Sequence, residues 1–212
     1  MLKLYDYFRS TACYRVRIAL NIKELDYDLE TIHLIHHGGE QHSANYKAIN
    51  PQALVPALKE DEQVLTQSLA IIEYLDEVYP SPPILPKKPH EKALVRAFAL
   101  SIAADIHPLN NLRVLNYLKN ELTITDEEKQ KWYHHWMLLG LTALESALAN
   151  HEKRAFCFTD YPTLADICLV PQLYNAKRFH CDLTPYPNLV RIDQHCATLK
   201  AFADAYPQES YA

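Results

Sequence analysis

A cluster of prolines near the middle of the chain sets the main limit on how it can fold. Five of the thirteen prolines fall within residues 80–89. Proline fixes φ and lacks the amide hydrogen that helices and sheets require, so this stretch is neither helix interior nor a central strand. A proline-rich stretch with little glycine is a stiff, extended connector. The chain is therefore predicted to form two domains, residues 1–82 and residues 88–212.

The composition favours a globular protein of the cytoplasm. Hydrophobic residues make up 49% of the 212 and charged residues 22%, which excludes a mainly disordered chain. A net charge of −5 disfavours nucleic acid as a partner. No run approaches the roughly 20 apolar residues of a membrane helix, and the first residues lack the apolar core of a secretion signal. The five cysteines, odd in number and without a C-x-x-C pair, predict a reduced, intracellular protein with no disulfide or zinc site.

The first domain alternates between strand and helix patterns. Period-two alternation predicts strands, and apolar residues three and four apart predict helices. The expected elements are strands at 2–5 and 27–34, helices beginning at Ser10 and Gln67, and a hairpin around the acidic turn 59–62. This β-α-β, then β-β-α order predicts a small α/β sandwich. Gly38 and Gly39, two of only three glycines, indicate a loop with unusual backbone angles.

The second domain reads as all-helical. The expected helices cover 90–119, 126–149, a stretch beginning at Thr163 and 187–205, with Asp126 as the cap of the second. Thr163 and Asp166 have the spacing of a helix start in which the acidic side chain reaches back to the first amides.

Ser10 stands where the first strand passes into the first helix. Unpaired amides and the positive end of the helix dipole meet there, and they favour an anion. Two interpretations stay open: Ser10 caps the helix, or it also donates a hydrogen bond to an incoming thiolate, whose pKa such a place lowers. Ser10-x-x-Cys13 has the span of a thioredoxin-type C-x-x-C whose first cysteine is replaced by serine. Because a serine hydroxyl cannot perform disulfide exchange, a thioredoxin-like fold here requires an external thiol, namely glutathione.

Two further segments fit a peptide ligand. A cis bond between Val55 and Pro56 would leave the Val55 backbone free to pair with a bound peptide, although a plain strand-edge proline is the simpler interpretation. Gln67 and Ser68 open a helix whose amides and hydroxyl can hold a carboxylate, or merely cap it.

Several blocks resemble the zeta class of glutathione transferases over essentially the whole chain. Residues 8–20, FRSTACYRVRIAL, resemble the class signature S-S-C-x-x-R-V-R-I-A-L. Further similar blocks are NPQALVPAL at 50–58, QSLAIIEYL at 67–75, IHPLNNL at 106–112, ADICLVPQ at 165–172 and DLTPYP at 182–187. The chain departs from the pattern at Ala12, where the class commonly has cysteine. The resemblance therefore gives no role to a cysteine at this position, while the role of Ser10 is kept.

The resemblance implies the glutathione transferase fold, which is a thioredoxin-like α/β domain followed by an all-α helical domain, and a homodimer. The implied activity is that of maleylacetoacetate isomerase, the glutathione-dependent cis-to-trans step of tyrosine and phenylalanine breakdown, through transient thiolate addition. It makes Ser10 and Thr11 the catalytic pair. The implied glutathione contacts are Ser10, Thr11, Gln41, Val55, Gln67 and Ser68, with His107, Asn111 and Arg113 from the helical domain.

The substrate would be a maleyl dicarboxylate, so cations are expected near it. Arg9, beside Ser10, and Arg178 are the candidates, because the planar guanidinium suits carboxylates. Cys13 reads as a packed thiol, and Arg15 and Arg17 as structural or interface residues. The histidines near 33–42 have no acidic or cysteine ligands at convincing spacing, so no metal is expected.

Three functions remain open. The first is maleylacetoacetate isomerase. The second is another glutathione enzyme on the same scaffold, such as a maleylpyruvate isomerase or a conjugating or dehalogenating transferase. The third is a non-catalytic binding protein, which the intact set of Ser10, Val55–Pro56 and Gln67–Ser68 disfavours.

Overall fold

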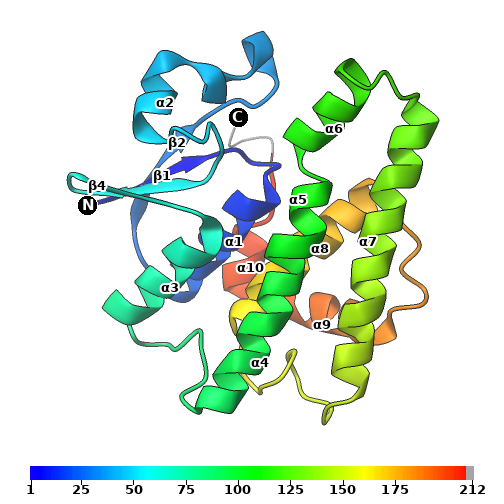
Figure 1. Ribbon diagram of the computed structural model, residues 1–212. Helices are drawn as coiled ribbons and strands as arrows, with labels where there is room; N and C mark the ends of the chain where they lie inside the picture. Colours follow the sequence, from blue (N-terminus) through cyan, green and yellow to red (C-terminus); the bar gives the residue numbers. More distant parts are fainter. Residues whose placement is uncertain (209–212) are drawn as a thin grey trace. The chain divides into compact units, whose positions relative to one another are not determined.

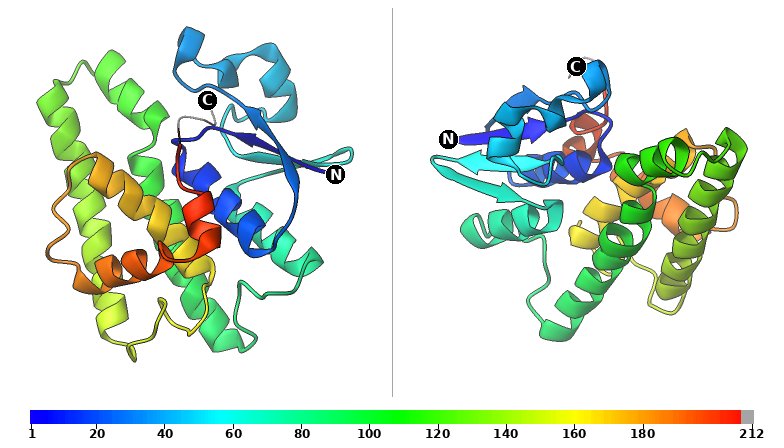
Figure 2. Two further views of the ribbon diagram at one scale, coloured as in Figure 1. Left: turned by 180° about the vertical axis from the view of Figure 1, so that it is seen from behind. Right: turned by 45° about the horizontal axis from the view of Figure 1, so that its top comes forward.

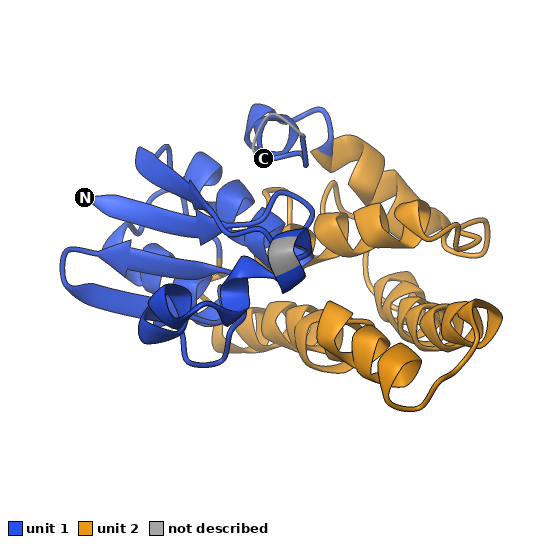
Figure 3. Ribbon diagram, turned by 90° about the horizontal axis from the view of Figure 1, so that it is seen from above, with its two compact units in different colours: residues 1–84, 197–212 blue, residues 85–196 orange. Residues whose placement is uncertain are grey.

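The computed structural model describes residues 1–208, and of His37 the backbone only. Contacts divide the chain into two compact units (Figure 3). The first joins Met1–Ile84 to the stretch that begins at Ala197, and the second is Leu85–Cys196. The predicted domains, 1–82 and 88–212, stay a prediction. They differ from this division in that the chain from Ala197 packs on the first unit.

The first unit holds a four-stranded mixed sheet with helices on both faces. Its elements are β1 Leu2–Asp6, α1 Thr11–Ile22, β2 Tyr27–Thr31, the short turns η1 His36–Gly38 and η2 Glu40–His42, α2 Ala44–Ile49, β3 Ala57–Glu60, β4 Gln63–Thr66, α3 Ser68–Val78 and α10 Lys200–Asp204. The strand order is β2-β1-β3-β4, with β1 parallel to β2 and the other pairs antiparallel. Helices α1 and α3 cover one face and α2 lies on the other (Figures 1 and 2).

This arrangement confirms the predicted β-α-β, then β-β-α order. The strand at 27–34 is shorter than predicted, because the chain leaves the ladder after Thr31. Helix α2 was not predicted from the sequence. At the centre of the sheet Leu4 pairs with Leu58, and both side chains are fully buried. Burial of this kind supplies most of the stability of a small sheet.

Side chains of α1 hold the C-terminal segment in place. Tyr14, Arg17 and Asn21 donate hydrogen bonds to the backbone carbonyls of residues 202, 205 and 201. The predicted single helix over 187–205 is wrong. Helix α9, Pro187–Cys196, ends at Cys196. A separate helix, α10, begins at Lys200, and the residue before it, Leu199, is extended.

The second unit is helical, as predicted. Its elements are α4 Pro89–Leu100, the π-helical segment η3 Ser101–Ile106, α5 His107–Leu109, α6 Leu112–Asn120, α7 Asp126–Ala149, α8 Leu164–Arg178 and α9. Among residues 1–208, no helix has both the length and the apolar character needed to cross a membrane.

The predicted single helix over 90–119 is interrupted. Pro108 has no amide hydrogen to offer the preceding turn, and the chain passes through a π-helical segment before it. Asn111 is extended, with ψ 147°, and its side chain accepts a hydrogen bond from the Arg113 amide at 3.1 Å. Because this cap starts a new helix, the long helix becomes separate segments.

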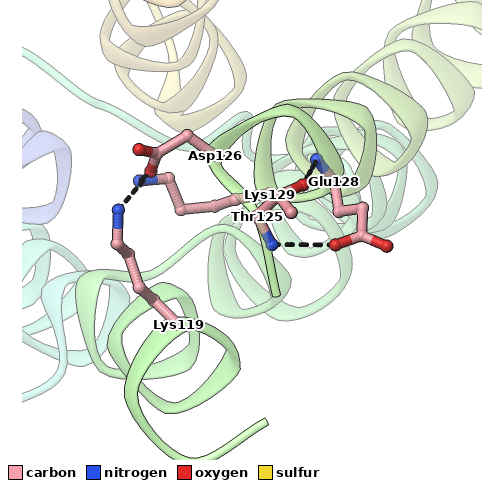
Figure 4. A network of polar contacts seen from close by, with 5 residues as sticks. All are labelled: Lys119, Thr125, Asp126, Glu128 and Lys129. Carbon is pink, nitrogen blue, oxygen red and sulfur yellow. Dashed lines mark hydrogen bonds and ion pairs between the residues drawn. The ribbon is translucent and has the colours of Figure 1, made fainter. Parts of the chain in front are cut away.

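Two capping boxes begin the longest helices of this unit. In α7 the cap is Thr125 rather than the predicted Asp126: Thr125 and Glu128 exchange hydrogen bonds of 2.8 and 3.1 Å, while Asp126 pairs with Lys119 and Lys129 (Figure 4). In α8 the prediction is confirmed, since the buried Asp166 carboxylate accepts from the Thr163 amide at 2.8 Å.

Candidate functional site

Ser10 caps α1, so the simpler of its two interpretations is confirmed. Its backbone is extended, with ψ 118°, and its Oγ accepts a hydrogen bond from the Cys13 amide at 3.3 Å. The side chain is half-buried at the end of the strand-to-helix turn. Since Oγ is the acceptor in that bond, the Ser10 O–H remains a donor. The Cys13 side chain is one hydrogen-bond partner of this hydroxyl in the structure. Thr11, the next residue, is buried as the first residue of the helix. The hydrogen bond to a thiolate stays a prediction.

Cys13, three residues after Ser10 in the sequence, is fully buried. Burial, with the nearby Asp6 carboxylate as a second cause, raises the pKa of this thiol well above its ordinary value. A buried thiol with a raised pKa has almost no thiolate at neutral pH, which is the reactive form. All five cysteines are buried, and none of them forms a disulfide.

Two side chains hold the turn before Val55 by hydrogen bonds to the same backbone carbonyl, that of Leu54. Leu54 O accepts from Tyr46 Oη and from Asn50 Nδ2, both at 2.7 Å. The bond from Val55 to Pro56 is cis. Val55 packs against the cluster around Tyr46 and lies two residues before β3, outside the ladder of the sheet.

Gln67, the residue before α3, has a strained backbone. Its φ is 70° and its ψ 114°, in a region that non-glycine residues rarely enter, and its Nε2 donates to Gln52 Oε1 at 2.9 Å. Strain of this kind gathers at ligand-binding segments. Ser68 follows as the first residue of α3 and is buried, and its Oγ accepts from Arg15 Nη1 at 3.3 Å.

Arg15 is a candidate for the functional site that was not predicted from the sequence. Its guanidinium joins α1, which begins with the Ser10–Thr11 pair, to Ser68 on α3. The sequence assigned Arg15 a structural or interface role, because nothing in its spacing ties it to residue 68. Gln52 was likewise missed, although it stands inside the block that carries Val55.

Gln41 lies in a tight loop closed by Glu40 and His33. Glu40 N donates to His33 O, and His33 N donates to the Glu40 carboxylate, each at 2.7 Å. Gln41 is buried and its Nε2 donates to Leu34 O at 3.3 Å, while its Oε1 accepts no hydrogen bond from the described part of the chain. Gly38 and Gly39 have φ of 80° and 97°, which confirms the unusual angles predicted for this loop.

Four predicted site residues belong to the second unit. His107 Nε2 lies 3.5 Å from Asn111 Nδ2 at the break between α5 and α6, and Arg113 is exposed on the first turn of α6. Arg178 is exposed at the end of α8, with its guanidinium 5.0 Å from the ring centroid of Phe179. Their roles in binding stay predictions.

Arg9 and the histidines complete the predicted set. Arg9 is half-buried, with its guanidinium 4.8 Å from the ring centroid of Phe8. His33 and His36 stack with ring centroids 4.0 Å apart. Within the described side chains, no three His, Cys, Asp or Glu residues are grouped so as to hold a metal ion.

Comparison with known proteins places the chain in a family. Residues 4–83 match the family model of the glutathione S-transferase N-terminal domain. A "probable maleylacetoacetate isomerase" of Vibrio cholerae serotype O1 is 51% identical over 205 residues, which cover 97% of this chain and 95% of that protein.

Two solved structures are similar over nearly their whole length. One is a holo maleyl pyruvate isomerase, described as a bacterial glutathione S-transferase of the zeta class, with 44% identity, a TM-score of 0.95 and coverage of 99% of this chain and 100% of that one. The other is the maleylacetoacetate isomerase of Methylobacterium extorquens AM1 with bound malonate and glutathione, with 37% identity, a TM-score of 0.93 and coverage of 97% and 96%. These likenesses confirm the glutathione transferase fold. The chain belongs to the zeta class of glutathione transferases, the family of the maleylacetoacetate isomerases.

Proposed function

We propose that this chain is a glutathione-dependent isomerase that converts maleylacetoacetate to fumarylacetoacetate. The family supports a maleyl isomerase, and the curated relative with 51% identity supports the choice of substrate. The observation that carries the dependence on glutathione is the pairing of Ser10 with Cys13. The hydroxyl at the start of α1 is a hydrogen-bond donor, while the Cys13 thiol, three residues further along, is buried and has a raised pKa. The sulfur nucleophile must therefore come from outside.

The residues of the first unit fit glutathione. A peptide ligand needs backbone partners, a carboxylate site and polar side chains that are still able to bond. Val55 lies outside the sheet ladder, Ser68 opens α3, and Gln41 has a buried Oε1 with an open lone pair in the described chain. These three residues, with Gln67, are proposed to hold the tripeptide.

Ser10 and Thr11 are proposed as the catalytic pair. When bound, glutathione supplies a thiolate that adds to the cis double bond and leaves after rotation about the resulting single bond. Ser10 Oγ–H donates a hydrogen bond to that sulfur, and the first amides of α1 add the positive end of the helix dipole. Both favour the charged form and lower the pKa of the thiol. Arg9 and, in the second unit, Arg178 are proposed to bind substrate carboxylates, because the guanidinium fork pairs with them in two parallel hydrogen bonds.

The test follows the loss of maleylacetoacetate absorbance with and without glutathione. Turnover that needs glutathione supports the proposal, and turnover without it overturns it. Ser10→Ala should lower kcat/KM by about 10² or more, since one donor to a developing charge is worth that much. Cys13→Ala is the matched control at the same helix start and should keep most of the activity. The reverse pattern would assign the sulfur chemistry to the protein's own thiol.

Maleylpyruvate is the second candidate substrate, because the zeta-class structure with 44% identity is a maleyl pyruvate isomerase. Both compounds should be offered to the same preparation, and the higher kcat/KM decides. We keep the prediction that the protein forms a homodimer and is located in the cytoplasm.

A further inference from the structure

The end of α8 that carries Arg178 is fixed on either side of this residue. Lys177 forms an ion pair with the buried Asp193 of α9. On the other side, His134 Nε2 on α7 lies 2.7 Å from the backbone oxygen of Phe179. A carbonyl oxygen only accepts, so the imidazole is the donor in this bond. The backbone at Arg178 is therefore tied to both α7 and α9.

The Arg178 side chain lies against an aromatic ring that is itself held in place. Arg178 is exposed, and its guanidinium carbon is 5.0 Å from the ring centroid of the half-buried Phe179. The Phe179 ring stacks on the ring of Tyr133, with centroids 4.0 Å apart and an angle of 26° between the planes. Tyr133 is only 2% exposed, so close packing fixes its position. The guanidinium thus has an anchored surface to lie on.

A guanidinium in contact with a ring still has its N–H donors for a ligand. The cation–π attraction uses the flat face of the group, whereas the hydrogen bonds of the fork run along its edges. An arginine side chain without such a support moves among many rotamers, so it reaches carboxylates at many distances. Contact with Phe179 favours the rotamers that keep the guanidinium near the ring. The fork of Arg178 is then presented at a defined place.

This placement matters because the two candidate substrates differ in length. Maleylacetoacetate has one methylene group more than maleylpyruvate between its two carboxylates. A bidentate pair with an arginine depends on direction as well as on distance. A fork at a defined place therefore favours the substrate whose second carboxylate reaches it while the other end of the molecule is bound.

We propose that Phe179, backed by Tyr133, is a positioning residue that holds Arg178 and so selects substrates by the separation of their carboxylates. The proposal rests on the proposed function, in which Arg178 binds a substrate carboxylate. Phe179 acts through Arg178 and need not touch the substrate itself.

The first experiment measures binding and needs no turnover. Malonate, succinate, glutarate and adipate are titrated into the protein with saturating glutathione, and ligand-detected NMR gives the Kd of each. In the unaltered protein the tightest and the weakest of these dicarboxylates should differ by about tenfold in Kd, because one length fits best. Phe179→Leu should reduce this difference to about threefold, since a cation–π contact at an exposed site is worth a factor of about two to five. Phe179→Tyr retains the ring face and should retain the difference.

Phe158→Leu is the matched control for the loss of a ring. Phe158 is also half-buried in the second unit, and its ring contacts Phe98 and His151. Urea unfolding should show that both leucine variants lose stability, while only Phe179→Leu changes the length preference. In the background of Arg178→Gln, Phe179→Leu should have no further effect on that preference, because it acts through the arginine.

Three results of these titrations would overturn the proposal. The first is a length preference that survives in Phe179→Leu, and the second is an equal change in Phe158→Leu. The third is an unaltered protein that binds all four dicarboxylates equally.

The second experiment compares the turnover of maleylacetoacetate and maleylpyruvate. Phe179→Leu should bring the ratio of their kcat/KM values about threefold closer to one. The change should come through KM, with kcat for maleylacetoacetate kept within about twofold. An equal loss for both substrates would indicate a structural role only and would overturn the proposal. Failure of the unaltered protein to isomerise either compound with glutathione would instead overturn the proposed function.

Discussion

Gly140 in α7 lies directly against the side chain of Ile106, the last residue of the π-helical segment. A Cβ placed on residue 140 would lie 2.2 Å from Ile106 Cγ1. No side chain fits at that distance, so the contact requires glycine in the middle of a helix, where glycine otherwise costs stability.

Gly140→Ala should therefore destabilise the protein, although the same change in an open helix stabilises it. Forcing a methyl group into a packed contact costs about 1–3 kcal/mol. Urea unfolding measures the change. The double variant Gly140→Ala/Ile106→Ala opens space for the methyl group, so the effects of the two substitutions should be less than additive. Full additivity would contradict the contact.

Gly39→Ala should weaken glutathione binding more than Gly38→Ala does. Both glycines have positive φ, so alanine strains the backbone at either position by about 1–2 kcal/mol. Only at Gly39 would the new Cβ meet the Gln41 side chain, 2.5 Å from its Nε2, while nothing lies within 4 Å at Gly38. The comparison of the two Kd values isolates the role of Gln41. Equal values would remove Gln41 from the proposed site.

Asp166→Ala should lower the free energy of unfolding by about 2–4 kcal/mol, because it leaves buried donors without partners. The carboxylate accepts from the amides of Thr163 and Cys157, each at 2.8 Å. Asp166→Asn keeps one acceptor oxygen and should cost less. Asp182 is an exposed control that binds Thr184 in a similar way, and Asp182→Ala should cost less than either. Denaturant curves for the three variants test this order.

The Asp126 carboxyl should titrate at unusually low pH. Hydrogen bonds and charge from Lys119 and Lys129 lower its pKa to about 2 (Figure 4). A pKa that is lower in the folded chain than in the unfolded one stabilises the fold above about pH 4, and this contribution is lost as the pH falls through about 2. Carboxyl NMR titration measures the pKa directly. Lys119→Ala and added salt should each move it back toward about 3.9. An unchanged value would contradict the pairing.

The sequence predicted the elements whose signals are local. The Ser10 cap and the hairpin around Asp61 depend on neighbouring residues, and both agree with the structure. The breaks at Pro108–Asn111 and at Leu199 were missed, because apolar spacing continues across them. The missing amide of Pro108 and the Asn111 side-chain cap interrupt the first of these helices, and an extended Leu199 separates α9 from α10.

The residues of the candidate site fall into the same two groups: those with a local sequence signal and those whose contacts depend on the fold. Ser10, Val55, Gln67 and Ser68 were predicted because they stand in motifs. The hydrogen bond from Arg15 to Ser68 joins residues 53 positions apart. Sequence patterns relate residues a few positions apart, so they do not predict this contact. The orientation of Gln41 likewise depends on the fold of its loop.

The burial of all five cysteines matters for a protein proposed to work beside a reactive peptide thiol. Thiol–disulfide exchange requires an accessible thiolate, and the folded chain offers none. Oxidised glutathione or a thiol-alkylating agent should therefore leave the cysteines of the native molecule unmodified. Once the fold opens, the same sulfurs become available, so the rate at which they are labelled reports how often the chain unfolds.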